Sequence, residues 1–492
     1  MFGNQIAGKI FSEGKRNFFS FNPILNEENT SSFTIATKEE IESALSHSLN
    51  SFYAFSSSKT VDRAKLLELI AQELDSNKSA IAKAYHKESG LSLNRFEIEF
   101  KRTYDQLFLF AHHLNNSNFD FISETPGDQK NSLPHLVKKH VSIGPIVVFG
   151  ASNFPLAYST IGGDTVSALA AGCPVIVKAH PFHPETSFLV GQAINNAIEK
   201  TLFPSGIFSQ LYDDQFTVAH QLVQDNRIKG VAFTGSYLGG KTLFDLANSR
   251  STPIPVFAEM GSLNPVFVFE TLLQEKSEGW STLFSKSITN DAGQFCTKPG
   301  LFFIPATENG KKFVSLLSEK LIQEPSFTML HPSIHANFEM KKQEITEQSK
   351  GELFEKKEPM ARLEGRQGLL LTNASEFLEL ASLNKEVFGP FAVICYYDTL
   401  NQLKECTEKI SGQLTATILA TQEELMVNES FVFMVNQLAG RIIFNNVPTG
   451  VRVCESMHHG GPYPATTDSR FTAVGTDSIL RFTRPIVHQD NC

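Results

Sequence analysis

Residues 145–180 read PIVVFGASNFPLAYSTIGGDTVSALAAGCPVIVKAH, and this stretch decides the fold class. It holds two short apolar runs, PIVVFGA (residues 145–151) and PVIVKAH (residues 174–180), with a segment rich in small residues between them. Apolar runs of this length suit strands that are buried on both faces of a parallel sheet. The small-residue segment, residues 162–171, suits the helix that connects two such strands. The stretch therefore predicts one strand–helix–strand unit of an α/β fold.

The same alternation continues on the C-terminal side of this unit. Repeated strand–helix alternation predicts a doubly wound parallel sheet, Rossmann-like, with ligands at the C-terminal ends of its strands. Upstream, residues 38–116 are expected to be helical, because apolar residues recur at spacings of three and four in AKLLELIAQEL (residues 64–74). A second α/β series is expected over residues 267–444. The further strands are predicted at residues 207–212, 230–235 and 255–260, and the further helices at residues 186–200, 218–224 and 236–248.

Composition narrows the class of protein. The chain has 492 residues, of which 41% are hydrophobic and 19% are charged, so disorder is excluded and two or three domains are expected. Its net charge of −9 argues against a general nucleic-acid binder, which needs a basic face. The N-terminal residues lack the apolar run of a secretory signal, and no stretch has the length of a membrane span. With six scattered cysteines and no framework spacing, these features predict a cytoplasmic protein that binds no membrane.

Two further segments look like exposed strands. HLVKKHVSIG (residues 135–144) alternates in polarity, and SILRFTRPIV (residues 478–487) reads as a long strand. A strand left at the edge of a sheet offers unpaired backbone groups to another chain. We expect both segments at sheet edges, in a homodimer or a homotetramer.

Three polar side chains lie at or just after the C-terminal ends of predicted strands, and so would lie at one edge of the sheet. Glu259 ends the strand at residues 255–260, where burial would raise its pKa towards that of a general base. Asn153 follows the strand at residues 145–151, and its amide could donate to an oxyanion. Lys178 could hold a ribose or a phosphate. Each also has an ordinary interpretation: an ion pair or cap for Glu259, a turn for Asn153 and a solvated surface charge for Lys178.

The usual dinucleotide motif G-x-G-x-x-G is absent, and its nearest substitute is the sequence Phe-Thr-Gly-Ser at residues 233–236. Gly235 would let the backbone approach a phosphate, and the helix that starts after Ser236 would stabilise its charge. When these residues are taken alone, plain helix capping explains them more often than phosphate binding does.

Cys296 differs from the other cysteines, because it lies in a polar, glycine-containing segment next to Lys298. A reactive thiol needs access and a lowered pKa, and this is the one cysteine whose surroundings suit both; an ordinary loop cysteine is the alternative. Cys173, Cys395 and Cys406 lie in apolar or amphipathic runs, Cys454 is less clear, and Cys492 ends the chain. Histidines occur in pairs at residues 112–113, 180/183 and 458–459 without zinc spacing, so solvated or supporting histidines and no metal site are expected.

Together these residues resemble the aldehyde dehydrogenase superfamily in order and spacing. The resemblance covers nearly the whole chain, and its C-terminal part, residues 451–481 with HGGPYPATTDSR at residues 459–470, is similar to one branch. That branch holds α-ketoglutarate semialdehyde (2,5-dioxovalerate) dehydrogenases and an NADP-dependent fatty aldehyde dehydrogenase. The chain departs mildly from the family pattern at two places. Ser262-Leu263 stands where Gly-Lys is commoner after the Glu-x-Gly, and Ala151-Ser152 stands where Pro-Trp is commoner before Asn153. The matching motifs are Asn153-Phe154-Pro155, Lys178, Phe233-Thr234-Gly235-Ser236, Glu259-Met260-Gly261, Gly293-Gln294-Phe295-Cys296 and Glu386-Val387-Phe388-Gly389-Pro390.

The resemblance implies a role for each site residue. Cys296 would attack the aldehyde, Asn153 and the Cys296 amide would stabilise the oxyanion, and Glu259 would activate the water that cleaves the thioester. Glu386 would hold the nicotinamide ribose with Phe388 beside the ring, while Lys178, Gly235 and Ser236 would hold the adenosine end and the pyrophosphate. It also implies a cofactor-binding domain (residues 1–119 and 145–262), a catalytic domain (residues 263–469) and a small β oligomerisation arm (residues 120–144 and 470–492).

For the cofactor, NADP is favoured over NAD. Relatives that prefer NAD commonly carry a glutamate three residues after the strand-end lysine, and here that position is Pro181. Lys178 could pair with a 2′-phosphate and His180 or His183 could add a donor. Against this, the adjacent carboxylates Asp213 and Asp214 would oppose a phosphate if they faced the pocket.

The branch favours α-ketoglutarate semialdehyde as substrate, and Arg452 and Arg470 are the candidates to bind its carboxylate. A medium- or long-chain fatty aldehyde is the alternative, because the 42 phenylalanines could line an apolar tunnel. A thiol hydrolase or acyltransferase without a redox step is an alternative from a different class.

Overall fold

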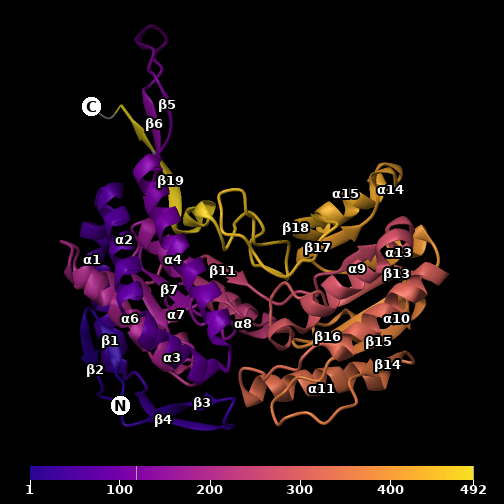
Figure 1. The fold of residues 1–492 in the computed structure, drawn as a ribbon. Coiled ribbons are helices and arrows are strands. Elements are labelled where there is room, and N and C mark those ends of the chain that lie inside the picture. Colours follow the sequence, from indigo (N-terminus) through magenta and orange to yellow (C-terminus); the bar gives the residue numbers. More distant parts are fainter. Residues whose placement is uncertain (118, 491–492) are drawn as a thin grey trace.

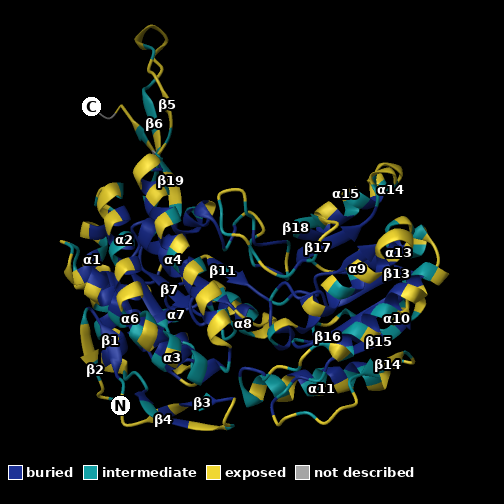
Figure 2. Cartoon of the chain, viewed as in Figure 1, coloured by how far each residue is buried: buried dark blue, intermediate teal, exposed yellow. Residues whose placement is uncertain are grey.

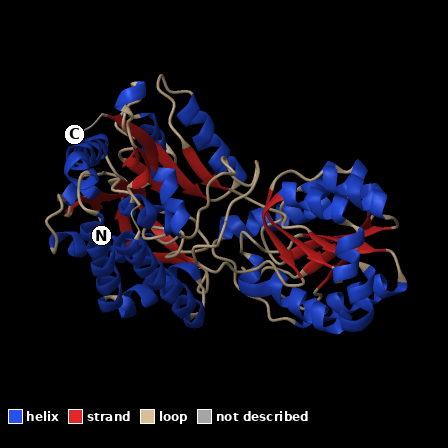
Figure 3. Ribbon diagram, turned by 90° about the horizontal axis from the view of Figure 1, so that it is seen from above, coloured by secondary structure: helices blue, strands red, loops and turns tan. Residues whose placement is uncertain are grey.

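The computed structural model describes residues 1–117 and 119–490, which form two α/β lobes and a projecting β arm (Figure 1). Seen from above, each lobe contains its own sheet with helices around it (Figure 3). The strands are mostly buried, while the outward faces of the helices are exposed (Figure 2). Within the described chain, no helix is both long and apolar enough to cross a membrane.

The first lobe is built on a seven-stranded sheet in which five consecutive strands, from one edge inward, are parallel, which confirms the doubly wound fold class. The chain runs from β7 to β8 and β9 on one side and then crosses to β10 and β11 on the other. The point of reversal lies between β7 and β10, which is where such sheets bind ligands. In spatial order the strands are β11 (Val256–Glu259), β10 (Gly230–Thr234), β7 (Ile146–Phe149), β8 (Val175–Lys178), β9 (Phe208–Leu211), β1 (Asn4–Ile6) and β2 (Lys9–Phe11).

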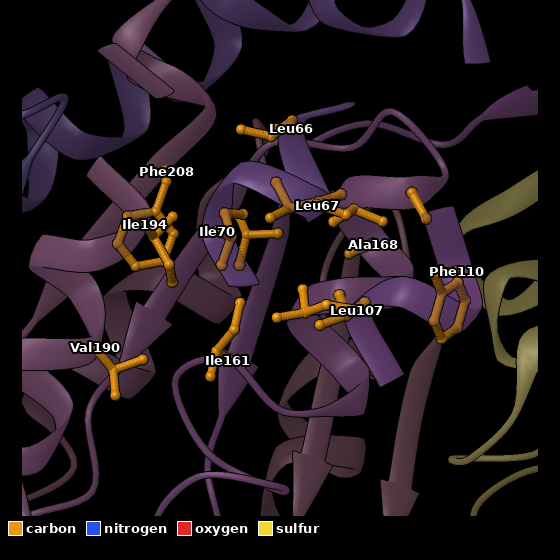
Figure 4. Close-up of a cluster of buried hydrophobic side chains, with 14 of the residues drawn as sticks. Leu66, Leu67, Ile70, Leu107, Phe110, Ile161, Ala168, Val190, Ile194 and Phe208 are labelled. Atoms are coloured by element: carbon orange, nitrogen blue, oxygen red, sulfur yellow. The ribbon is translucent and has the colours of Figure 1, made fainter. Parts of the chain in front are cut away.

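Alternate residues of these strands face opposite layers of helices. Ile146 and Val148 of β7 pack into one cluster with helices α2, α4, α5 and α6, part of which Figure 4 shows. Val147 and Phe149 pack into the other cluster, with α1, α7 and α8. Because both faces are covered, β7 is apolar throughout and β8 is apolar up to its last residue, Lys178, as the sequence predicts. The helices are α1 (Lys38–Ser56), α2 (Thr60–Ser76), α3 (Lys78–Ser89), α4 (Leu93–Asn116), α5 (Gly163–Ala170), α6 (Pro184–Glu199), α7 (Thr217–Gln224) and α8 (Tyr237–Asn248).

The expected helical stretch at residues 38–116 is confirmed as four separate helices, α1 to α4. Smaller differences occur at strand ends: residues 205–207 form the 3-10 turn η2 (Ser205–Ile207), so β9 begins one residue later than expected. A two-stranded sheet of β3 (Asn17–Asn22) and β4 (Glu27–Thr34) adjoins this lobe near the N-terminus.

The second lobe contains another seven-stranded sheet, in which all neighbouring pairs are parallel except β14 with β15. This confirms the second α/β series. Its strands, in spatial order, are β14 (Glu352–Glu355), β15 (Gly368–Asn373), β16 (Phe391–Tyr397), β13 (Leu301–Pro305), β12 (Val266–Val268), β17 (Gln413–Leu419) and β18 (Ala439–Phe444). Its helices and 3-10 turns are α9 (Glu270–Thr289), η3 (Asn290–Gly293), α10 (Glu308–Gln323), α11 (Pro332–Gln348), α12 (Ala374–Glu379), η4 (Ala381–Asn384), α13 (Leu400–Glu408), α14 (Gln422–Val427) and α15 (Glu429–Leu438).

The arm corrects one expectation. Its sheet has the order β19–β6–β5, so β6 (Leu136–Ser142) is the central strand rather than an edge, and it pairs over its whole length with β19 (Thr483–Gln489) of the same chain. Residues 476–482 form the 3-10 helix η5 (Thr476–Phe482), so the expected strand at residues 478–487 begins only at residue 483. The edges of the arm are β19 and β5 (Phe121–Thr125), and η1 (Gln129–Asn131) lies at its turn. Cys492 lies outside the described residues.

Candidate active site

The loop that carries Cys296 enters from the second lobe in an unusual backbone conformation. Asp291, Ala292 and Gly293 all have positive φ angles, of 46°, 56° and 65°. A Cβ atom at Gly293 would collide with the carbonyl oxygen of Gly389, so only glycine lets the two segments lie this close. The Asp291 carboxylate is bound by Arg95 of α4 at 2.9 Å, which fastens the loop to the first lobe. The bend thus places Cys296 between the lobes.

Two asparagines fix this loop by hydrogen bonds. Nδ2 of Asn153, in the loop after β7, donates to the carbonyl oxygen of Gln294 at 2.9 Å. Nδ2 of the fully buried Asn264 donates to the carbonyl oxygens of Cys296 and Lys298, at 2.8 and 2.9 Å. The structure therefore brings Asn153 to the Cys296 loop as expected. Asn264 has no local signal in the sequence that would have singled it out.

Cys296, His459 and Glu259 form a compact cluster. The half-buried Sγ of Cys296 lies 3.7 Å from Nε2 of His459, which lies 3.1 Å from Oε1 of Glu259 at the end of β11. Glu259 is 3% exposed and His459 is fully buried, so of the two expectations for the 458–459 pair, His459 fits a supporting histidine and not a solvated one. A thiol, an imidazole and a carboxylate in this order can pass a proton from one to the next. Their ligand atoms all lie within 4.8 Å of one another, a grouping that a zinc ion could also bridge.

The charges of this cluster differ from those expected. Burial and the neighbouring Glu259 raise the pKa of the Cys296 thiol well above its ordinary value, so the thiol is protonated. Burial by itself would raise the pKa of Glu259, but the charge and hydrogen bond of His459 lower it below its ordinary value. The expectations of a raised Glu259 pKa and of a lowered Cys296 pKa are therefore both wrong. Glu259 is an ionised carboxylate close to a neutral thiol, and its Oε2 atom is buried without a partner among the described residues.

An aromatic wall borders the cluster. Phe154, Tyr158 and Phe295 are buried together with Ala151, Ala157 and Val474, and Val451 and Val453 of the C-terminal segment pack against them. The rings of Phe154 and Phe295 lie 5.6 Å apart, edge to face, and the Tyr158 ring lies 6.2 Å from that of His459. The wall gives the thiol an apolar surround on the side of α4.

The residues expected at the phosphates lie at the edge of the first sheet. Lys178 pairs in register with Phe149 of β7, and Phe149 with Phe233 of β10, so the strand ends are level. Ser236 is the N-cap of α8, and its hydroxyl accepts a hydrogen bond from the Gly239 amide at 3.2 Å. Gly235 and Ser236 are exposed, which leaves the first turn of α8 accessible to an anion.

Lys178 has an unsatisfied charge. Its half-buried ammonium group makes no hydrogen bond or ion pair with any described residue. Burial lowers the pKa of Lys178 to about 8, although Asp213 and Asp214 act in the opposite direction. An anionic ligand bound beside Lys178 would stabilise the charged form of the ammonium and raise its pKa.

The two aspartates that could oppose a phosphate are already engaged. Asp213 accepts from the amides of Gln215 and Val218 at 3.0 and 2.8 Å, and Asp214 is ion-paired with Arg16. Arg16 precedes β3 and is brought to this region by the fold alone. His180 accepts from the Phe182 amide at Nδ1, and burial lowers its pKa well below the ordinary value, so its ring is neutral with Nε2 as the donor.

The Glu386 segment lies against the other side of the Cys296 loop. A Cβ atom at Gly261 would collide with the Glu386 carboxylate, so the glycine permits this approach. Burial raises the pKa of Glu386, opposed by the nearby ammonium of Lys298. Lys298 is buried and donates to the carbonyl oxygens of Val387 and Phe391 at 3.1 and 2.7 Å, which anchors the segment that also carries the half-buried Phe388.

The two arginines expected to bind a carboxylate do not suit that role. Arg452 is exposed. Arg470 is also exposed, and its guanidinium pairs with Asp468 at 2.6 Å. A carboxylate on the substrate would have to compete with that aspartate.

Comparison with known proteins agrees with this geometry. The family described as "Aldehyde dehydrogenase family" matches residues 10–462. Alpha-ketoglutaric semialdehyde dehydrogenase 2 of Azospirillum brasilense is 38% identical over 462 residues, which are 93% of this chain and 88% of that protein. Alpha-ketoglutaric semialdehyde dehydrogenase of Acinetobacter baylyi is 37% identical over 463 residues, with the same coverage of both chains.

Solved structures with low sequence identity share the fold. The structure of 3,6-anhydro-L-galactose dehydrogenase in complex with NAP superposes with a TM-score of 0.85 at 20% identity and covers all of both chains. A 1-pyrroline-5-carboxylate dehydrogenase from Thermus with bound NAD has a TM-score of 0.84 at 18% identity, covering 99% of this chain and 92% of that one.

Proposed function

The chain belongs to the aldehyde dehydrogenase family, and on that premise we propose that it oxidises α-ketoglutarate semialdehyde to α-ketoglutarate through a thiohemiacetal and a thioester on Cys296. Family membership makes the protein an NAD(P)-dependent aldehyde dehydrogenase, which sets aside a hydrolase without a redox step. Relatives with 37–38% identity over most of the chain are named for this substrate. The observation that carries the chemical proposal is the Cys296–His459–Glu259 cluster.

The first step is attack on the aldehyde. The Cys296 proton passes to the His459–Glu259 pair while Sγ bonds to the carbonyl carbon, because ionised Glu259 stabilises a positive charge on His459. The carbonyl oxygen becomes an oxyanion, for which Asn153 and the Cys296 backbone amide are the proposed donors. Asn153 donates one amide hydrogen to Gln294 and keeps the other for this purpose.

The thiohemiacetal is then oxidised to the thioester, and NAD(P)+ when bound supplies the hydride acceptor. Two features support the fit of this chain to a dinucleotide: the unpaired Lys178 ammonium and the accessible first turn of α8 after Gly235 and Ser236. On the nicotinamide side, Glu386 is proposed to bind the ribose and Phe388 to pack beside the ring. The glycine at position 261 allows Glu386 to reach this place.

Hydrolysis of the thioester completes the reaction. Glu259 is the proposed general base, since its carboxylate is ionised and Oε2 has no partner among the described residues. The proton taken from Cys296 in the first step would first leave the His459–Glu259 pair for solvent. Glu259 would then take a proton from a water molecule as the water attacks the thioester carbon. This proton would pass to the departing Cys296 sulfur, so that the carboxylic acid leaves and the thiol is restored.

We further propose NADP as the preferred cofactor. No carboxylate stands at position 181, Asp213 is occupied by backbone amides, and Asp214 is paired with Arg16. Lys178, which forms no ion pair with a described residue, then provides a positive charge for a 2′-phosphate, and neutral His180 provides a donor at Nε2.

The remaining proposals concern organisation. We propose that residues 1–119 and 145–262 bind the cofactor, that residues 263–469 form the catalytic domain, and that residues 120–144 and 470–492 pair subunits of a cytoplasmic homodimer or homotetramer. The exposed edges β5 and β19 support the last point, because each offers a strand to a second chain.

The test of the proposed function is a comparison of kcat/KM for α-ketoglutarate semialdehyde and decanal, with NADP+ and with NAD+. We expect the short carboxylate-bearing aldehyde and NADP+ to be preferred. Cys296→Ala should abolish turnover and still bind NADP+. A clear preference for decanal, which the aromatic wall beside the thiol would favour, would contradict the substrate assignment, and ordinary turnover by Cys296→Ala would contradict the mechanism.

A further inference from the structure

Three arginines surround the aromatic wall beside Cys296, and they differ in how their charges are balanced. The guanidinium of Arg95 lies 4.4 Å from the ring centre of Phe154 and that of Arg102 lies 4.8 Å from the ring centre of Tyr158. Arg95 pairs with Glu99 and Asp291 at 3.1 and 2.9 Å, so its charge is neutralised. Neither Arg102 nor Arg441 pairs with a carboxylate in the described part of the chain.

Arg102 reaches the wall from α4. Its Nη2 donates to the Tyr158 hydroxyl at 2.7 Å, and its Nε is buried without an acceptor. A guanidinium has five N–H donors, so this single bond leaves most of them free for a ligand. The contact with Tyr158 fixes the side chain beside the ring that also lies near His459.

Arg441 reaches the same region from β18 in the other lobe. Its Nη1 and Nη2 donate to the carbonyl oxygens of Gly450 and Pro448 at 2.9 and 2.6 Å, directly before Val451 joins the wall, and its Nε is also buried without an acceptor. Electrostatically, both arginines act on the thiol, because each lowers the pKa of Cys296. Arg441 and Arg102 therefore flank one site from opposite lobes.

We propose that Arg102 and Arg441 form the subsite that binds the remote carboxylate of a short aldehyde whose carbonyl carbon lies at Cys296. The inference rests on the proposed function and names the residues that would determine its substrate preference. A carboxylate on the substrate would balance the positive charges of the two unpaired arginines. An apolar alkyl chain in the same place would exclude water from both guanidinium groups and offer no opposite charge in return. Arginine also suits this ligand, because its planar fork matches a carboxylate with two parallel hydrogen bonds.

The test compares two five-carbon aldehydes, α-ketoglutarate semialdehyde and pentanal, which has no carboxylate. The measured quantity is the ratio of their kcat/KM values in the wild type, Arg102→Gln, Arg441→Gln and the double variant. We expect each single substitution to lower the ratio about tenfold or more, as the loss of a hydrogen bond to a charged group does. The control is Arg470→Gln, an exposed arginine already paired with Asp468, which should leave the ratio within about twofold.

Two results separate this inference from the proposed function. If the wild type does not prefer the carboxylate-bearing aldehyde, the substrate proposal fails, and the subsite fails with it. If the wild type prefers it and the glutamine variants keep the same ratio, only the arginine assignment is overturned. Should a glutamine variant fail to fold, Arg102→Lys and Arg441→Lys replace it, and a ratio equal to that of the wild type in both would overturn the proposal, because lysine cannot form the paired hydrogen bonds.

Discussion

Lys178→Met is expected to change cofactor choice, and the structure sets the size of the effect. The ammonium has no partner among the described residues, and its pKa is lowered by burial to about 8. A hydrogen bond to a charged group contributes roughly 1.5–3 kcal/mol, so its loss should lower kcat/KM for NADP+ by about 10- to 150-fold. NAD+ lacks the 2′-phosphate and should lose much less, so the preference for NADP+ should fall by at least about tenfold.

The same lysine predicts a pH dependence. Below about pH 8 the Lys178 side chain is charged before the cofactor arrives, and above its pKa of about 8 it is neutral and must take up a proton when a phosphate binds. KM for NADP+ should therefore rise as the pH increases past 8, while KM for NAD+ should follow this rise only weakly, and Lys178→Met should remove the difference.

Initial rates at one saturating aldehyde concentration, with the concentration of each cofactor varied, measure these quantities over a pH range that brackets the Lys178 pKa of about 8. The control is Lys65→Met, an exposed lysine of α2 that should leave both cofactors unaffected. Equal losses for NADP+ and NAD+ in Lys178→Met, or NAD+ preferred by the wild type, would refute the assignment of Lys178 to the 2′-phosphate.

Three other predictions concern the cluster and the arm. In His459→Ala, Glu259 loses the neighbour that lowers its pKa, so the acidic limb of the pH–rate profile should move to higher pH and the rate should fall by about 10²-fold or more; an unchanged limb would show that His459 does not control Glu259. Zinc should inhibit by binding Cys296, His459 and Glu259, with recovery on chelation and protection by aldehyde, whereas inhibition that Cys296→Ala retains would point to another site. Light scattering at micromolar concentration should give a dimer or tetramer, and a monomer would exclude pairing through β5 or β19.

The parallel sheets could be predicted from sequence because burial on both faces leaves a local signature. Ile146–Phe149 is apolar at every position, Val175–Lys178 is apolar up to its last residue, and proline directly precedes each strand. Asn153, which comes after the first of these strands, and Lys178, which ends the second, could be placed at one edge because parallel strands end level. Their position follows from the order of strands and helices along the chain, which the local sequence pattern predicts.

The arm was predicted less well, because an alternating pattern does not tell a central strand from an edge strand. Leu136–Ser142 lies between two strands, and its partner Thr483–Gln489 is more than three hundred residues away in the chain. Such pairing depends on tertiary contacts that no local pattern records.

The electrostatics of the site could not be predicted for a related reason. His459 lies 200 residues from Glu259 and 163 from Cys296, so the sequence offered no basis for expecting its hydrogen bond or the lowered pKa of Glu259. Arg16, Arg102 and Arg441 are likewise brought to the site by three separate elements. Charge balance at a site depends on where distant side chains meet, which requires the fold.

The most direct test is mass spectrometry of Glu259→Gln after mixing with α-ketoglutarate semialdehyde and NADP+. Glutamine cannot act as a general base, so the enzyme should form one equivalent of NADPH in a burst and then stall. Peptide mapping should find the acyl group on Cys296, bound as a thioester that hydroxylamine releases. A burst without an adduct on Cys296, or steady turnover at the wild-type rate, would contradict the proposal that this chain oxidises its aldehyde through a Cys296 thioester that Glu259 resolves.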